Sequence, residues 1–163
     1  MARVRSLVVN LNLKHPRTGV TQRDVYDFLD QPAPLLEGFE LVASDSDSIL
    51  HSYPLHSELF HGHAPQLVRF STRDAFEVPW TSPLFTNLAH LTVEYNIKSV
   101  TWRYRRHPTL STILALLHRA RHMTTLTLVG CLPTRVREGE AWSKRVDLPE
   151  LTYIRLGGVS VGV

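Results

Sequence analysis

The sequence contains a single cysteine, Cys131, and only three lysines among its 18 basic residues. One cysteine cannot form an internal disulfide, which excludes a disulfide-stabilised scaffold and leads us to expect a reducing compartment, cytoplasmic or nuclear. No apolar run approaches the roughly 20 residues that a transmembrane helix needs. The basic N-terminal stretch lacks a small-residue cleavage site, so we expect neither a signal peptide nor a membrane partner.

The sequence also lacks the motifs of common catalytic and phosphate-binding sites. It contains no G-x-S-x-G, no P-loop and no G-x-G-x-x-G, and the terminal GGVSVG precedes no expected helix. The serines and aspartates of residues 44–48 are explained by turn formation. We therefore expect a non-enzymatic protein without a cofactor.

The remaining composition is that of one folded domain. The chain has 163 residues, of which 43% are hydrophobic and 20% charged, and its formal net charge is +3. This length is normally a single domain with a substantial core, here residues 1–163. A charge this small neither demands nor excludes a nucleic-acid partner.

A repeated motif organises the chain. The stretch MTTLTLVGC fits the leucine-rich repeat template L-x-x-L-x-L-x-x-N/C, with its first apolar residue at Met123. LAHLTVEYN repeats the spacing from Leu88, and VRSLVVNLN repeats it from Val4. Three looser copies bring the total to six, which start near residues 4, 36, 67, 88, 123 and 151. The spacing of these starts is irregular because segments of different length are inserted between the strands.

Each x-L-x-L unit alternates, so its apolar side chains point to one face and their neighbours to the other. Such strands bury little alone, but they share one core when stacked in parallel. The fold class expected is α/β: a leucine-rich repeat solenoid with a parallel concave β-sheet of about six strands. Helices or irregular loops would cover the convex side.

Two stretches have helical periodicity. Thr21 with Asp24 resembles a capping box, and Val25, Phe28 and Leu29 form an apolar stripe behind it. A second helix is capped by Thr109 or Ser111. Its expected apolar side consists of Leu110, Ile113, Leu114, Leu117 and Ala120. Residues 49–63 show no clear period and are expected to be irregular or a single turn.

The strand ends carry two further signals. Asn12, Asn96 and Cys131 occupy the N/C position of the template, where an inward side chain can bond backbone groups of adjacent turns. We expect these three to form a structural turn ladder, with Cys131 a buried structural thiol. Pro34, Pro65 and Pro149 each stand two residues before the first apolar position, and proline there can enter the strand extended.

At these residues the chain resembles leucine-rich repeat proteins, and more narrowly the repeat region of fungal, mushroom-type F-box proteins. The phrases that carry the resemblance are QPAPLLEGFEL, LFHGHAPQLVRFS, VPWTSPLFTNLAHLTVEYN, PTLSTILALLHRARHMTTLTLVGCLP and VDLPELTYIRL. The resemblance implies a protein-interaction scaffold, the substrate-recognition part of a ubiquitin-ligase receptor. The sequence departs from that family because it has no F-box, so a ligase adaptor is expected only if an F-box is supplied elsewhere.

The concave sheet face is the natural contact surface of such a solenoid. The repeat register assigns to it six residues suited to holding a protein or peptide ligand, since arginine and tyrosine are frequent interface hot spots. These residues are Arg69, Arg73, His90, Glu94, Tyr153 and Arg155. The alternative is a solvated sheet face with no dedicated ligand.

Other stretches suggest other partners. Residues 98–107 interleave aromatics with arginines, including Trp102 and Tyr104, which is the composition of a platform for RNA or single-stranded nucleic acid. Nucleic acid is the alternative function, not the one we favour.

The histidines at positions 51, 56, 61 and 63 lack nearby cysteines and tight ligand spacing, so we expect loop histidines and no metal site. The first and last strands have no recognisable cap. We therefore expect self-association through the sheet edges, or a longer receptor of which this chain is a piece.

Overall fold

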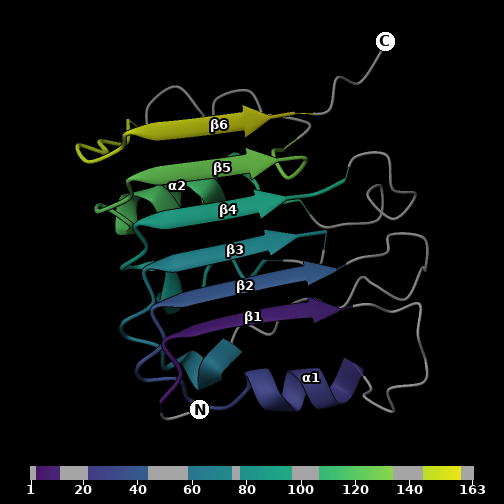
Figure 1. Ribbon diagram of the computed structural model, residues 1–163. Helices are drawn as coiled ribbons and strands as arrows, with labels where there is room; N and C mark the ends of the chain where they lie inside the picture. Colours follow the sequence, from purple (N-terminus) through teal and green to yellow (C-terminus); the bar gives the residue numbers. More distant parts are fainter. Residues whose placement is uncertain are drawn as a thin grey trace.

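The computed structural model describes residues 3–11, 22–43, 59–74, 78–96, 107–133 and 145–158. Within them a single sheet contains six strands, all parallel, in the spatial order β1 to β6 (Figure 1). The strands are β1 (Ser6–Leu11), β2 (Gly38–Ala43), β3 (Arg69–Arg73), β4 (His90–Glu94), β5 (Thr125–Val129) and β6 (Tyr153–Gly157). The expected α/β class and six-stranded parallel sheet are confirmed.

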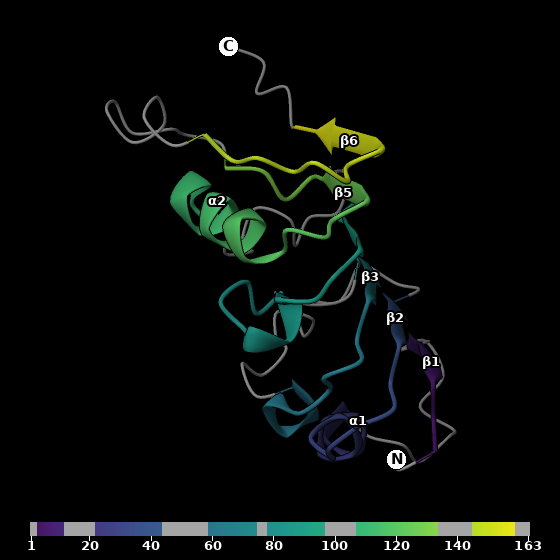
Figure 2. The same cartoon turned by 90° about the vertical axis from the view of Figure 1, so that its left-hand side faces the viewer.

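The helices of the described residues lie on one side of this sheet, as Figure 2 shows with the strands seen nearly end-on. They are α1 (Gln22–Leu29), η3 (Leu59–Gly62), η4 (Pro83–Phe85) and α2 (Leu110–Arg119), of which η3 and η4 are 3-10 turns. Parallel neighbours need a crossover between them, and these segments are the crossovers. The row of strands follows an arc whose hollow side is the face without helices.

The strand register is the one that the repeat alignment predicts. Across the sheet, Leu7 lies beside Phe39, then Phe70, Leu91, Leu126 and Ile154. A second row, two residues further along each strand, runs from Val9 to Leu41, Thr72, Val93, Leu128 and Leu156. Every apolar repeat position therefore points toward the helices, which is why one core serves the whole sheet.

Aromatic side chains fill the middle of this core. Phe39 packs edge-on against Phe60 of η3, with ring centroids 5.2 Å apart, and lies 5.6 Å from Phe70. Phe70 in turn contacts Phe85 of η4 at 4.9 Å. The two short 3-10 turns therefore close the core where no long helix does. The expectation of a single turn within residues 49–63 is confirmed for η3, and residues 49–58 lie outside the described part.

Hydrogen-bonded turns precede four of the strands. The N–H of Leu36 donates to the carbonyl of Ala33, and the same three-residue spacing joins Leu67 to Ala64, Met123 to Ala120 and Leu151 to Leu148. Pro34, Pro65 and Pro149 are the second residues of such turns, where their fixed φ is favourable. The expectation that these prolines enter the strands extended was therefore wrong. The buried alanines Ala33, Ala64 and Ala120 are part of the repeat that the template did not include.

The helices form where expected, but their buried faces differ in detail. Thr109 caps α2, since its Oγ1 accepts a hydrogen bond of 3.1 Å from the N–H of Thr112. The side of α2 that packs on the sheet is rotated from the expected stripe, because Leu116 is buried while Leu110 and Leu114 are only half-buried. In α1, Leu29 is buried but Phe28 is 47% exposed.

The last strand is less covered than the sequence led us to expect. Ile154 and Leu156 occupy core rows, yet they are 53% and 56% exposed, whereas Leu126 and Leu128 beside them are 1% exposed. β6 is an edge strand in the sheet order, but so is β1, whose Leu7 and Val9 are half-buried and pack against the core. β6 is therefore the less covered of the two edges.

Candidate functional site

The face of the sheet opposite the core is covered by no helix of the described residues (Figures 1 and 2). Three rows of side chains lie on it, and we call them together the outward face. The first row is Ser6, Gly38, Arg69, His90, Thr125 and Tyr153; the second is Val8, Glu40, Ser71, Thr92, Thr127 and Arg155; the third is Asn10, Val42, Arg73, Glu94, Val129 and Gly157. All six residues expected to bind a partner lie on the outward face.

Glu94 forms one cluster with two of these residues, Arg73 and Arg155. Its Oε2 lies 3.1 Å from Nε of Arg73 on the neighbouring strand β3, and its Oε1 lies 3.1 Å from Nη1 of Arg155 on β6. The Glu94 side chain is 20% exposed, while the two arginine side chains are 60% and 56% exposed. The carboxylate is thus screened by the guanidinium groups that flank it, and their outer N–H groups face solvent.

A shallow hollow of about 280 Å³ lies at this cluster, near the carboxyl ends of the strands. Besides the three charged residues above, Asp74, Tyr95, Asn96 and Val129 line it. Asp74 accepts a hydrogen bond from the backbone N–H of Asn96. Two arginines and two carboxylates balance in formal charge, so this hollow is suited to a partner that offers both donors and acceptors, and not to a simple anion.

His90 lies at the amino ends of the strands, away from the Glu94 cluster, and two threonines hold its ring in place. Its Nδ1 lies 2.8 Å from Oγ1 of Thr125 and 3.3 Å from Oγ1 of Thr124. The Thr124 hydroxyl also donates to the carbonyl of Ala89 at 2.9 Å. This network orients the half-buried imidazole on the outward face, which prepares its remaining ring nitrogen for a hydrogen bond with a partner.

Arg69 and Tyr153 lie at different places in the same row. Three strand spacings separate them, about 14 Å. Tyr153 is 52% exposed, and Arg69 is exposed and lies over Gly38, with its Nε 3.6 Å from where a Cβ on that glycine would be. The six residues therefore form one compact charged cluster and one separate row, and a ligand that touches both must span several strands.

The expected turn ladder is only partly as predicted. Cys131 is buried, its Sγ lies 3.8 Å from the carbonyl oxygen of Val93, and burial raises the pKa of its thiol to about 12. A thiol that keeps its proton in this way is a structural group. Asn96 lies at the surface, and Tyr95 before it is buried instead, so the inward asparagine expected there was wrong. Asn12 lies outside the described residues.

The other stretches singled out in the sequence do not come together as a site in the described part of the chain. His61 and His63 are exposed, and His51 and His56 lie outside the described residues. Among the described residues, no group of three or more His, Cys, Asp or Glu side chains could hold a metal ion. Of the basic aromatic loop 98–107, only His107 is described, so the nucleic-acid alternative remains a prediction.

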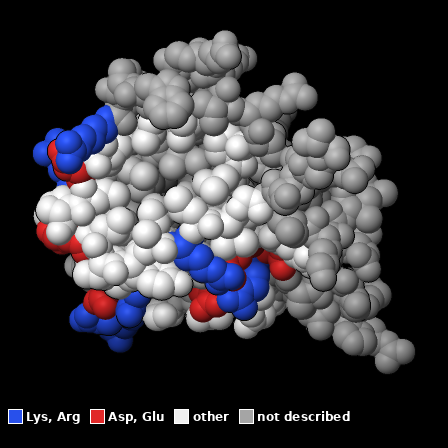
Figure 3. All heavy atoms as spheres, turned by 90° about the horizontal axis from the view of Figure 1, so that it is seen from above, with Lys and Arg blue, Asp and Glu red and all other residues white. Residues whose placement is uncertain are grey.

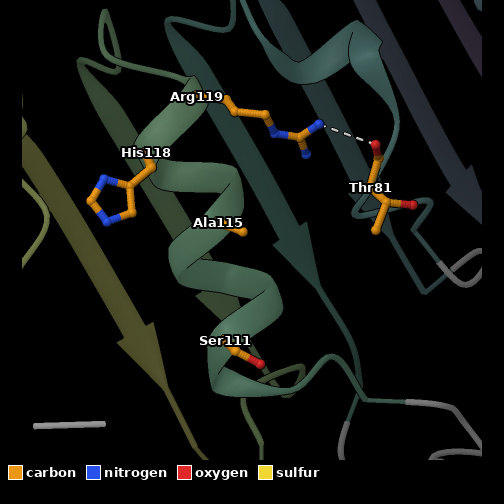
Figure 4. A pocket seen from close by; sticks show the side chains of 5 residues that line it. All are labelled: Thr81, Ser111, Ala115, His118 and Arg119. Carbon is orange, nitrogen blue, oxygen red and sulfur yellow. Dashed lines mark hydrogen bonds between the residues drawn. The ribbon is translucent and has the colours of Figure 1, made fainter. Parts of the chain in front are cut away.

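A second hollow, of about 660 Å³, lies on the helix side of the sheet (Figure 4). Its lining comes from α2, with Ser111, Ala115 and Arg119, and from Thr81 before η4. Figure 4 shows Arg119 extending toward Thr81, while His118 points away from it. The Arg119 guanidinium donates to the carbonyls of Trp80 and Thr81, both at 3.1 Å. It therefore connects α2 to the segment before η4, a structural role that the sequence did not indicate.

Charged side chains are mixed in sign over the surface. Figure 3, which views the molecule from above β6, shows blue and red spheres in small adjoining groups separated by wide white areas. No broad patch of one sign occurs among the residues described in this view. A mixed surface favours selective contacts with a folded or extended protein over general attraction of a polyanion.

No family model matches the chain, and neither the curated proteins nor the solved structures contain a significantly similar one. Among the described residues, no helix combines the length and the apolar character that a bilayer span requires.

Proposed function

We propose that the chain is a leucine-rich repeat solenoid that acts as a non-enzymatic protein-binding module. One observation carries this proposal: six parallel strands, consecutive in sequence and in space, place Arg69, Arg73, His90, Glu94, Tyr153 and Arg155 on one face that no helix of the described residues covers. Stacked units of this kind present extended hollow surfaces that bind other proteins.

The composition of the outward face supports a protein or peptide as the ligand. Arginine and tyrosine contribute much of the binding energy at protein interfaces, and here they are exposed and held on strands. Threonines and serines between them supply small hydrogen-bonding groups without blocking an approaching backbone. By the resemblance to F-box proteins, the ligand would be a substrate of a ubiquitin-ligase receptor, and an adaptor would bind only through an F-box supplied elsewhere.

A selection with a phage-displayed library of random linear peptides tests the proposal. Peptides enriched on the immobilised chain are measured individually against two variants, Arg69→Glu and Tyr153→Ala. We expect each variant to lose at least tenfold in affinity with an unchanged melting temperature, because both side chains are exposed and outside the core.

Arg121→Glu is the matched control, because Arg121 is an exposed arginine in the turn before β5 and lies outside the three outward rows. It should bind the selected peptides as the unchanged chain does. Failure of any peptide to enrich, or equal binding by Arg69→Glu and Arg121→Glu, would show that the outward face is not the recognition surface.

A further inference from the structure

Among the described residues, no strand pairs with the outer edge of β6, and this free edge carries exposed apolar side chains. In a parallel sheet, successive residues of a strand bond to alternate neighbours. The N–H of Tyr153 donates to the carbonyl of Thr124, and the carbonyl of Gly157 accepts from Gly130, so alternate residues of β6 bond to β5. The backbone groups of Ile154 and Leu156 therefore point to the outer edge, and their side chains are 53% and 56% exposed.

The junctions between strands repeat one hydrogen-bond pattern five times. At each junction, the carbonyl of the residue just before one strand accepts two hydrogen bonds. The donors are the N–H of the residue just before the next strand and the N–H of the first residue of that next strand. The accepting residues are Arg5, Glu37, Val68, Ala89 and Thr124, at distances from 2.7 to 3.1 Å. Thr152 comes next in this series, and its carbonyl is the position that a seventh strand would use.

The opposite edge of the sheet provides a matching strand. The N–H of Gly38 donates to the carbonyl of Arg5, so Ser6, Val8 and Asn10 of β1 have their backbone groups on the outer edge. If Ser6 of another copy is set beside Tyr153 in the register of the five existing pairs, Leu7 falls beside Ile154 and Val9 beside Leu156. Both core rows then continue with apolar residues from one copy into the next.

In this register, oppositely charged side chains of the two copies lie next to each other. The same alignment sets Arg3 beside Glu150, two residues before Thr152. Arg3 is exposed, and the Glu150 side chain is 49% exposed. By contrast, a symmetric, antiparallel contact between two β6 edges in the register that pairs Ile154 with Leu156 would set Arg155 opposite Arg155 of the other copy, and like charges directly opposite destabilise a strand pair.

We propose that a second copy of this chain adds its β1 to the free edge of β6, parallel and head to tail. The contact is heterologous, because it uses a different edge of each copy, so it leaves a free edge at both ends and allows further copies to add. The added β1 covers Ile154 and Leu156 in the same way that β6 covers Leu126 and Leu128 of β5. The contact is independent of the outward face and of what that face binds.

Blocking one edge at a time tests the geometry. Ile154→Pro removes an outward N–H from β6, and Val8→Pro removes one from β1, in each case without removing a donor to the neighbouring strand; proline is tolerated at sheet edges. We expect the mass of the unchanged chain in sedimentation to rise with concentration beyond that of a dimer. Each proline variant alone should be monomeric, and an equimolar mixture should form a one-to-one dimer and nothing larger.

Other outcomes overturn the proposal. A chain that stays monomeric up to about millimolar concentration has no such contact, since a weak specific association of Kd near 1 mM is detectable there. Self-association of Val8→Pro alone would indicate a symmetric β6 contact instead.

Amide hydrogen exchange of the unchanged chain gives a second measurement that does not depend on whether the variants fold. The amides of Val8, Ile154 and Leu156 should gain protection together as concentration rises. Protection confined to β6, or to neither edge, would contradict head-to-tail pairing.

Discussion

Arg155 on β6 reaches across β5 to place its Nη1 3.1 Å from Oε1 of Glu94 on β4. Arg73 on β3 binds the same carboxylate, so the Glu94 side chain links β3, β4 and β6, which a repeat template treats as separate units. The connection is electrostatic and lies partly in solvent, so its strength depends on salt.

Replacement of Glu94 by glutamine should leave Arg73 and Arg155 near each other without the charge that holds them. We expect the free energy of unfolding to fall by about 1 kcal/mol at low salt and by less in 1 M sodium chloride. Urea denaturation at the two salt concentrations measures this. Glu150→Gln is the control, because Glu150 is 49% exposed and pairs with an exposed histidine, so its loss should matter little. An equal effect of the two substitutions would show that the Glu94 cluster is an ordinary surface pair.

Thr72 is a buried threonine in a core row otherwise occupied by apolar residues. It is 0% exposed, and its Oγ1 has no hydrogen-bond partner. Valine has nearly the same shape without the unsatisfied hydroxyl, so Thr72→Val should stabilise the protein by about 1 kcal/mol. The measurement is the urea midpoint at constant slope. Thr92→Val, on the outward face of the next strand, should change it little. A destabilised Thr72→Val variant would mean that the hydroxyl is bonded in solution.

Leu91 and Ile154 occupy the same core row but should respond differently to truncation. Leu91→Ala removes a side chain that is 0% exposed and should cost about 3 kcal/mol. Ile154→Ala, at 53% exposure, should cost about 1 kcal/mol or less in dilute solution. Thermal denaturation at micromolar concentration compares them. Similar losses would show that β6 is covered in the monomer, which would also remove the reason for an edge contact.

The thiol of Cys131 should be inert in the folded protein. Its pKa is raised from 9.0 to about 12 by burial, so at pH 8 a thiol reagent should modify the native chain far more slowly than the urea-unfolded chain. The same shift sets a pH dependence. Between about pH 9 and about pH 12 the unfolded chain loses this proton while the folded chain keeps it, so stability should decrease as pH rises through that window. Rapid native modification at pH 8 would contradict the burial.

Much of the fold could be predicted from local spacing alone. The alternation of apolar residues in the six repeats predicted the strands and the face on which each side chain lies, because a strand's period of two allows only one face to be apolar. The common direction of the strands followed from the repeat template. The alternation therefore also placed Arg69, Arg73, His90, Glu94, Tyr153 and Arg155 on one face.

Only the tertiary structure decided how those residues combine. That Glu94 gathers Arg73 and Arg155, that Arg69 lies over Gly38, and that Arg119 binds the carbonyls before η4 depend on side-chain reach across strands, which no repeat pattern encodes. The exposure of Ile154 is of the same kind. Its sequence position is that of a core residue, and its exposure follows from how little of the structure packs against β6 at the edge of the sheet, which a repeat pattern does not encode.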